Sequence, residues 1–504
     1  MTYLVGGLYL IALTGLLFYG IHRFKVMWAC GWQRGPNRPL GRAKCGLGET
    51  RKLCIQCPVY NEPLVVVDLL ETVAALEWVP RHLEIQILDD STDETSRIIA
   101  RWMRENPERA ADMRHLRRNH RGGYKAGALA YGMTHSEAAF FAILDADFRP
   151  QADFLPALMT AFEDPEVGLV QARWTFSNRR SSFLTRLQAL FLDAHFVVEQ
   201  VARAETDLFF NFNGTAGIWR RTALEKAGGW SADTVTEDLD ISYRAQMAGW
   251  RFVYLADYTV PSELPEELIA FKSQQQRWTK GGIQVMRKLL GSLLKSEVSW
   301  RIKLEGFFHL NLGFIHFFLV LFALVFVPFL ILFGPVPHGL FWFVHPVVLL
   351  GAGGSALLFY LVGQFLRDAR WSELGLVMMA APLILSFGLA MGVTGLWAVV
   401  EGLFTQGGEF IRTPKGRRVG GSSGGPVPSR IGARFWILAG IEAMIATMFV
   451  GGAIYFLHQS LPLVALMLGV KAVGYLGLIG WFLHESWPAM KRPDRLEVLP
   501  VLDS

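Results

Sequence analysis

The chain has 504 residues, of which 52% are hydrophobic and only 18% are charged, and its formal net charge is +5. Soluble domains carry about 25% charged residues, so this composition excludes a purely soluble enzyme. Residues 50–300 contain an ordinary share of charge, whereas 304–366, 374–404 and 433–483 are almost uncharged. We therefore expect an integral membrane protein with one large soluble domain, and the modest net charge gives no indication of a nucleic-acid partner.

The first apolar run, residues 3–21, is long enough to span a bilayer, which takes ~17–25 residues. The stretch that follows, 22–52, carries eight Lys or Arg residues against a single Glu. By the positive-inside rule, this excess places the N-terminus outside and the chain from residue 22 onward in the cytosol. We expect a transmembrane helix over 1–22, a basic cytosolic linker over 23–52 and a cytosolic domain after it.

Short apolar runs alternate with amphipathic segments between residue 53 and about 260. The runs LCIQCPVY, LEIQILDD, FFAILDADF and VGLVQARW predict strands, and the 3–4 spacing of apolar residues predicts helices over 65–78, 94–106 and 154–164. Strands separated by helices are typical of βαβ units on a mainly parallel sheet. Such sheets bind ligands at the carboxyl ends of their strands, and acidic residues collect there in ILDDSTD and ILDADF.

Two features of this region are interpreted as structural. Cys54 and Cys57 have CxxC spacing, but no second Cys or His pair stands at zinc-site spacing, so we expect small buried strand residues in a reducing setting. The stretch 97–121 carries eight arginines with acidic residues mixed in, which favours the solvated face of a helix.

The second half of the chain predicts a membrane bundle over 305–504. It is preceded by an amphipathic stretch, 284–304, that suits a helix lying in the membrane interface. We expect membrane spans at about 308–333, 340–366, 433–457 and 460–483. Residues 374–404 are also long enough to span the membrane, but basic segments flank them on both sides. The positive-inside rule places both flanking segments in the cytosol, so residues 374–404 must form a hairpin, a re-entrant pair or an interfacial segment. Lys471, within the last span, is expected to face the bundle interior or a polar path.

Several acidic motifs stand where the predicted sheet would bind a ligand. Asp145 and Asp147 follow the apolar run FFAIL, and alternate residues of an extended chain point to the same side. Two such carboxylates can hold a hard divalent cation that bridges a diphosphate, although a polar strand terminus is the simpler alternative. The pair is not isolated, because DDS at 89–91, TED at 236–238 and QQQRW at 274–278 also occur, in this order along the chain.

The ordered set PVYNEP, DDS, DxD, TED and QxxRW resembles the processive, membrane-bound inverting glycosyltransferases of family 2, which include cellulose, hyaluronan and mannan synthases. HRGGYKAGAL at 120–129 and FNGT at 212–215 are most similar to plant cellulose-synthase-like mannan and glucan synthases and their bacterial relatives. The resemblance implies an α/β GT-A (Rossmann-like) catalytic domain over 53–283, on the cytosolic side and inserted between transmembrane helices. It also implies a multi-pass protein of a bacterial-type inner membrane.

The resemblance implies roles for individual residues around the donor. The donor nucleotide would be bound by Glu62, Asp90, Lys125, Asp145 and Arg277. Asp145 and Asp147 would hold the diphosphate through Mg²⁺ or Mn²⁺, and Asp238 would be the general base that takes the proton of the acceptor hydroxyl. The alternative for Asp238 is the N-cap of the helix that TEDLDISY predicts, a position where Asp is favoured.

The resemblance also implies an acceptor site and a gating loop. The acceptor residues would be Trp278, Gln274, Asn213, Gly214 and Thr215. Sugar C–H faces pack well on an indole, although tryptophans are also common at membrane interfaces. Residues 409–416, within the loop 405–432, resemble the gating loop of cellulose synthases and contain Phe410, Thr413 and Lys415. A plain basic cytosolic loop is the alternative.

The expected function is metal-dependent, inverting transfer of a hexose from UDP-glucose or GDP-mannose to a growing β-glycan. We further expect the glycan to pass through the protein's own membrane helices. A glycolipid synthase, which adds one or a few sugars to a membrane lipid, is the alternative enzyme. A passive transporter would leave the α/β domain and its five ordered motifs unexplained. The motifs select neither the donor nor an oligomeric state.

Overall fold

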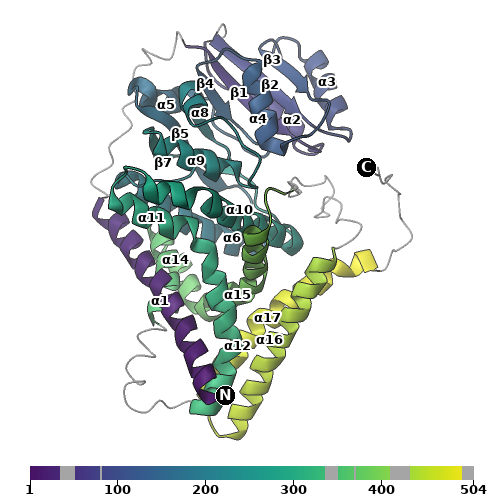
Figure 1. Ribbon diagram of the computed structural model, residues 1–504. Coiled ribbons are helices and arrows are strands. Elements are labelled where there is room, and N and C mark those ends of the chain that lie inside the picture. The colour runs from purple at the N-terminus through teal and green to yellow at the C-terminus, as the bar shows by residue number, and fades with distance from the viewer. Residues whose placement is uncertain (34–50, 80–81, 335–349, 368–369, 409–431, 491–504) are drawn as a thin grey trace.

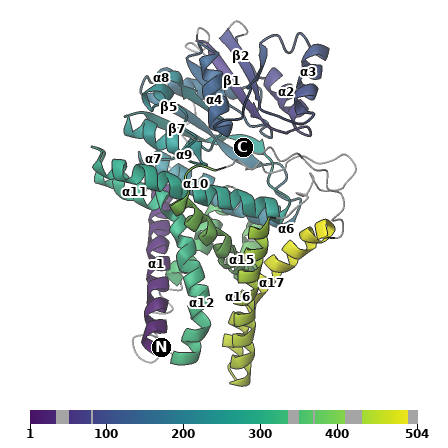
Figure 2. The same ribbon diagram turned by 45° about the vertical axis from the view of Figure 1, so that its right-hand side comes forward.

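The computed structural model describes residues 1–33, 51–79, 82–334, 350–367, 370–408 and 432–490. An α/β domain lies at one end of the molecule and long helices extend from its base (Figure 1). Between them, helix α10 (Leu268–Lys295) lies across the tops of the long helices (Figure 2). The α/β domain and the apolar helices expected from the sequence are therefore both present.

A seven-stranded sheet forms the centre of the α/β domain, in the order β3-β2-β1-β4-β6-β5-β7. Its strands are β1 (Leu53–Val59), β2 (Leu83–Asp89), β3 (Met113–Arg117), β4 (Phe140–Ile143), β5 (Val167–Phe176), β6 (Gly217–Arg220) and β7 (Arg251–Ser262). All neighbouring strands are parallel except β6, which is antiparallel to both β4 and β5. The mainly parallel sheet expected from the sequence is confirmed. β3, β6 and β7 were not predicted, because each is short or only half buried and lacks a clear apolar pattern.

Helices cover both faces of this sheet. The helices of the α/β domain are α2 (Val66–Ala74), α3 (Thr95–Glu105), α4 (Tyr124–Thr134), α5 (Phe154–Met159), α6 (Phe183–Ala194), α7 (Gln200–Glu205), α8 (Arg221–Lys226) and α9 (Glu237–Met247), of which α6 packs on the bundle through Leu184, Leu187 and Leu190. One apolar core packs α2, α3 and α5 on the sheet, and a second packs α4, α8 and α9 on it. Cys54 and Cys57 are fully buried free thiols, one in each core, as expected for structural strand residues.

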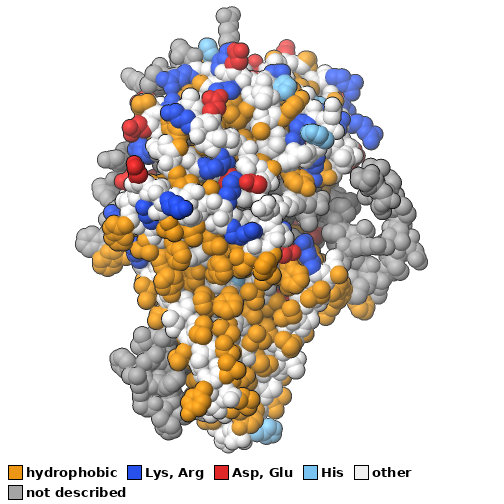
Figure 3. Space-filling view, viewed as in Figure 1, with side chains coloured by type: hydrophobic (Ala, Val, Ile, Leu, Met, Phe, Trp, Pro, Cys, Tyr) orange, Lys and Arg blue, Asp and Glu red, His pale blue; other side chains and the backbone are white. Residues whose placement is uncertain are grey.

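Five helices of the described residues are long and apolar enough to cross a membrane. They are α1 (Thr2–Gln33), α12 (Ile315–Phe333) with the turn before it, α15 (Trp371–Phe404), α16 (Ala433–His458) and α17 (Pro462–Met490). On the face shown in Figure 3, hydrophobic side chains cover the bundle, and Lys and Arg side chains gather at its boundary with the α/β domain. The expected span 340–366 is described only from residue 350, where α14 covers Ser355–Leu366.

The N-terminal helix is longer than the sequence predicts. α1 continues to Gln33, so the first part of the expected linker 23–52 is helical and residues 34–50 lie outside the described part of the chain. The reason is tertiary: Val26, Met27 and Cys30 are buried in the apolar core that α4 and α9 share with the sheet. α1 therefore joins the membrane bundle to the α/β domain directly.

The segment 374–404 is a single continuous helix, α15, so the hairpin and the re-entrant pair are wrong. Both of its ends contact the α/β domain. At its start Glu373 pairs with Arg180 at 2.5 Å, and just beyond its end the amide of Gly407 donates to the carbonyl of Asp233 at 2.8 Å. A helix whose two ends face the same domain favours the third alternative, an interfacial segment.

The predicted amphipathic helix 284–304 is also corrected. α10 begins at Leu268 and ends at Lys295, and a separate helix, α11, covers Trp300–Leu310. Gln274, Arg277 and Trp278 therefore lie inside α10 and not before it. The first half of α10 was not predicted because its polar residues interrupt the regular spacing of apolar residues. The partners of these polar residues come from other parts of the fold.

Candidate active site

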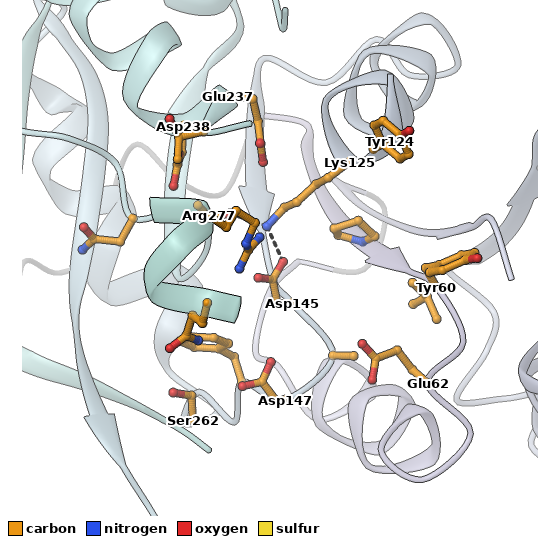
Figure 4. Close-up of a pocket in the computed structure, with 18 of the residues that line it drawn as sticks. Tyr60, Glu62, Tyr124, Lys125, Asp145, Asp147, Glu237, Asp238, Ser262 and Arg277 are labelled. Atoms are coloured by element: carbon orange, nitrogen blue, oxygen red, sulfur yellow. Dashed lines mark hydrogen bonds and ion pairs between the residues drawn. The ribbon is translucent and has the colours of Figure 1, made fainter. Parts of the chain in front are cut away.

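One cleft at the carboxyl ends of β1, β2 and β4 collects nearly all of the predicted site residues. It is lined by Glu62, Asp90, Lys125, Asp145, Asp147, Asn213, Gly214, Asp238, Gln274, Arg277 and Trp278, together with Tyr60, Arg121, Tyr124 and Glu237. Figure 4 shows Tyr60 and Glu62 on one side, Glu237 and Asp238 on the other, and Lys125, Asp145 and Arg277 between them. The sheet brings these residues together from segments far apart in the sequence.

Lys125 is the central cation of this cleft. Its ammonium donates to the Asp145 carboxylate at 2.5 Å and to the carbonyl of Gly214 at 3.0 Å. Burial by itself lowers the pKa of Lys125, but the carboxylates of Asp145 and Glu237 together raise it above its usual value. Gly214 has φ +85°, and a Cβ there would lie 3.0 Å from a carboxylate oxygen of Asp238, so only glycine fits between the lysine and the aspartate.

Thr215 holds the Asp145 backbone and does not line the cleft. It is fully buried, its hydroxyl accepts from the amide of Asp145 at 2.8 Å, and it donates to the carbonyl of Ile143 at 3.3 Å. The implied role of Thr215 in the acceptor site stays a prediction, and the structure shows it as a support of Asp145. The Thr215 hydroxyl thus bonds to the chain at the end of β4 and at Asp145. These two bonds fix the direction in which the carboxylates of Asp145 and Asp147 point.

Asp238 lies in the first turn of α9, and Thr236 is the N-cap residue, so the alternative that Asp238 caps this helix is wrong. Among the described residues Asp238 has no ion-pair partner, and its carboxylate accepts one hydrogen bond, from the amide of Leu239 at 2.9 Å. Burial, followed by the neighbouring charge of Glu237, raises the pKa of Asp238 to about 7. A carboxylate with such a pKa can accept a proton near neutral pH.

The basic stretch 97–121 is only partly a solvated helical face. Arg118 contacts Asp90 through two nitrogens, one of them at 2.9 Å, and both side chains are nearly buried. The guanidinium of Arg121 lies 3.3 Å from the centre of the Tyr60 ring. The sequence did not identify either arginine as a residue of the cleft. The only indication in the sequence is that both lie close to the KAGAL segment, which carries Lys125.

The helix α10 forms the wall of the cleft nearest the helical bundle. Burial lowers the pKa of Arg277, and the charges of Glu237 and Asp238 partly offset this effect. A Cβ at Gly281 would overlap Thr236, so the glycine allows α10 to lie directly against the loop before Asp238. The side chain of Gln284 extends this contact by accepting from the amide of Val235 at 3.0 Å.

A second cavity, of about 970 Å³, begins at Asp238 and Trp278 and continues into the membrane bundle. It is lined by both apolar and polar side chains, and the polar ones include Gln275, His195, His309, His316 and Lys471. Lys471 thus faces the bundle interior, as the sequence predicts. Trp278 and Asp238 are shared by this cavity and the cleft.

The gating-loop residues Phe410, Thr413 and Lys415 lie outside the described residues. The chain that leads into them is placed, and the carbonyl of Gly407 accepts from Gln284 at 2.8 Å. Residues 405–408 therefore run beside the loop that carries Asp238.

The cleft fits a divalent cation. Asp145 and Asp147 supply carboxylate oxygens to the same cleft, and Mg²⁺ in enzymes is commonly held by one or two carboxylates with substrate phosphates and water. No group of three or more His, Cys, Asp or Glu side chains is arranged for a metal within the described residues. The two aspartates would be the protein's own ligands, and a diphosphate would complete the set.

The model of the family described as "Glycosyl transferase family group 2" matches residues 140–336. Among curated proteins, glucomannan 4-beta-mannosyltransferase 7 of Arabidopsis thaliana is 39% identical over 303 residues, which cover 58% of this chain and 54% of that protein. Probable glucomannan 4-beta-mannosyltransferase 11 of the same plant is 36% identical over 324 residues, which cover 61% of this chain and 72% of that protein. This chain belongs to the family 2 glycosyltransferases. The resemblance noted from PVYNEP, DxD, TED and QxxRW is thereby confirmed.

The fold agrees with this family. A solved mannosyltransferase from Pyrobaculum calidifontis, in complex with GDP-Man and Mn²⁺, superposes with a TM-score of 0.50 over 79% of this chain and 99% of that one, at 18% identity. The expected GT-A catalytic domain is confirmed. The chain spans only about half the length of the first curated relative, 54%, so the family match does not carry over that protein's whole activity.

Proposed function

We propose that this protein transfers mannose from GDP-mannose to the end of a growing β-1,4-linked glycan. Two findings support mannose and GDP over glucose and UDP. The similar curated proteins are named glucomannan 4-beta-mannosyltransferases, and the solved protein of the same fold holds GDP-Man and Mn²⁺. The proposal includes a divalent cation held by Asp145 and Asp147, which would offset negative charge on the diphosphate.

The observation that carries the proposal is the position of Asp238 between the two cavities. Its carboxylate lines the donor cleft and also the mouth of the cavity in the bundle. A donor held by the cleft and a glycan that enters from the bundle would meet beside this carboxylate. Trp278 lines both spaces as well, which suits an aromatic platform for the acceptor sugar.

The chemistry then follows from the side chains. Asp238 takes the proton of the acceptor hydroxyl as the hydroxyl oxygen forms its bond to the sugar's anomeric carbon, and the bond from that carbon to the diphosphate breaks. Attack from the face opposite the diphosphate inverts the anomeric centre. Lys125 and Arg277, both partly buried cations in the cleft, face the negative charge that develops on the leaving group.

We further propose that the product leaves through the cavity in the bundle and that the α/β domain lies in the cytosol. The lining of the cavity is mostly apolar, but the aromatic and polar side chains within it suit a sugar chain. The Lys and Arg residues at the boundary suit a cytosolic face. A bacterial inner membrane remains a prediction, as does the gating role of Phe410, Thr413 and Lys415.

The test is sugar transfer by the purified protein in lipid nanodiscs, with GDP-mannose, GDP-glucose and UDP-glucose compared, each with Mn²⁺ or Mg²⁺. We expect GDP-mannose to give a polymer that β-mannanase digests, and excess EDTA to abolish transfer until metal is restored. Full transfer in excess chelator would remove the metal from the proposal. A short product that extracts into organic solvent would identify a glycolipid synthase instead.

A further inference from the structure

Three helices of the bundle each direct one glutamate at helix α10. The glutamates are Glu401 of α15, Glu442 of α16 and Glu485 of α17, and we call them the α10 anchors. All three contact α10 between its first residue and Gln276, immediately before Arg277 and Trp278. α10 itself lies between the α/β domain and the bundle (Figure 2).

The contact of Glu442 is a buried ion pair. The ammonium of Lys272 donates to its two carboxylate oxygens at 2.8 and 3.0 Å, and the two side chains are 1% and 0% exposed. Removing one partner of such a pair leaves a buried charge without its counter-charge, which strongly disfavours the original packing. The pair therefore fixes Lys272 against α16.

The contact of Glu485 supplies a cap that α10 lacks in its own sequence. The first amides of a helix have no partner within the helix, and a carboxylate near them is stabilising. Glu267, the N-cap residue of α10, makes no side-chain cap hydrogen bond. Instead the amides of Leu268 and Ile269 donate to Glu485 at 2.7 and 3.1 Å.

The contact of Glu401 reaches the residue beside Arg277. Its carboxylate accepts from the side-chain amide of Gln276 at 2.8 Å and from the indole of Trp397 at 2.9 Å. Gln276 is almost fully buried, so this bond sets the rotation of α10 at the point where the helix enters the cleft.

We propose that the α10 anchors are positioning residues that hold Arg277 and Trp278 at the correct place relative to Asp238 and to the mouth of the bundle cavity. The inference rests on the proposed function. A shift of α10 by one residue moves its side chains by ~1.5 Å along the axis, and a misplacement of about 1 Å at a reacting centre can cost ~10²-fold in rate. The other donor-binding residues come from the α/β domain, so a displaced α10 slows transfer while the donor still binds.

The experiment compares three variants in nanodiscs. E442Q removes the counter-charge of Lys272. K272M/E442L replaces the buried pair by apolar side chains of similar size, an exchange that often preserves or increases stability. E305Q is the matched control, because Glu305 is also a buried glutamate, 3% exposed, whose ion pairs with His22 at 2.8 Å and with Lys25 join α11 to α1, and among the described residues it makes no hydrogen bond or ion pair with α10.

We expect kcat to fall about tenfold or more in E442Q and in K272M/E442L, with shorter products, while KM for the donor and the dissociation constant of GDP stay within about twofold of the wild type. E305Q should keep the wild-type kcat. A K272M/E442L variant with wild-type melting temperature, kcat and product length would overturn the inference, because the pair would then serve stability alone. If the wild type itself transfers no sugar, the proposed function fails, whereas normal transfer by wild type and variants alike refutes only the positioning role.

Discussion

At the scale of single residues, the carboxylates of the cleft differ in their surroundings. Asp145 pairs with Lys125 at 2.5 Å and Asp90 pairs with Arg118, so each of these carboxylates has a cationic partner. Asp238 has no such partner among the described residues and lies, partly buried, beside the buried Glu237. Carboxylates in such different environments can have different roles. Asp238 is suited to accept a proton, whereas Asp145 and Asp90 are suited to bind cations.

This difference predicts both a mutational and a pH effect for Asp238. Asp238→Asn keeps the size and hydrogen bonding of the side chain but cannot accept a proton, so the transfer rate should fall by ~10²–10⁴-fold. Since the base acts in its deprotonated form and its pKa is raised to about 7, kcat of the wild type should fall as the pH decreases through 7 and level off above it. Steady-state rates from pH 5.5 to 9 measure this.

The control for Asp238→Asn is donor binding. GDP affinity and melting temperature should match the wild type, because Asp238 is not among the residues proposed to bind the nucleotide. A variant that turns over at a near-normal rate would show that another group takes the proton.

At the scale of secondary-structure elements, α10 and α15 approach so closely that their contact requires glycine. A Cβ on Gly402 of α15 would lie 2.8 Å from the Cβ of Ile283 and 2.8 Å from the carbonyl oxygen of Lys280. Both atoms belong to α10 close to the cleft, and neither can move without the helix. The distance between the two helices therefore depends on this glycine.

We predict that Gly402→Ala lowers stability by about 1–3 kcal/mol, the usual cost of overpacking, and reduces sugar transfer by moving α10. Gly375→Ala is the matched control on the same helix, since a Cβ there meets nothing within 4 Å and the exchange should be neutral or slightly stabilising. Thermal unfolding in detergent and transfer assays test both variants. Equal behaviour of the two alanine variants would disprove a tight α10–α15 contact.

At the scale of the whole molecule, the contacts of α15 determine how the bundle can sit in a membrane. Glu373 at its start and Gly407 after its end both contact the α/β domain. Both ends of α15 then lie on the same side as that domain, which agrees with the positive-inside rule because the sequence is basic before and after this helix. The turn between α16 and α17 lies at the opposite end of the bundle (Figure 1).

This arrangement predicts opposite labelling of two engineered cysteines by a membrane-impermeant reagent. Glu108→Cys, exposed in the α/β domain, should react only in inverted vesicles, whereas Gln459→Cys, exposed between α16 and α17, should react in intact cells. The unsubstituted protein serves as the background control. Labelling of position 108 in intact cells would reverse the proposed orientation.

The sequence by itself determined the family, the α/β domain, its strands β1, β2, β4 and β5, and nearly the whole set of cleft residues. These features depend on local signals: a buried strand is a run of apolar residues, and its ligand-binding end is the polar residue that follows. Asp145, Asp238 and Arg277 could be named because each belongs to a short motif at the end or start of an element.

Only the tertiary structure decided the features that depend on contacts between distant residues. Thr215 bonds to the amide of Asp145, 70 residues away, and Lys272 pairs with Glu442, 170 residues away. Contacts between distant residues also explain why α10 is continuous and why α15 is a single helix. They explain the pairing of Arg118 with Asp90 as well. Their stabilising partners are absent from the local sequence, and a buried polar group is satisfied only by what the folded chain places beside it.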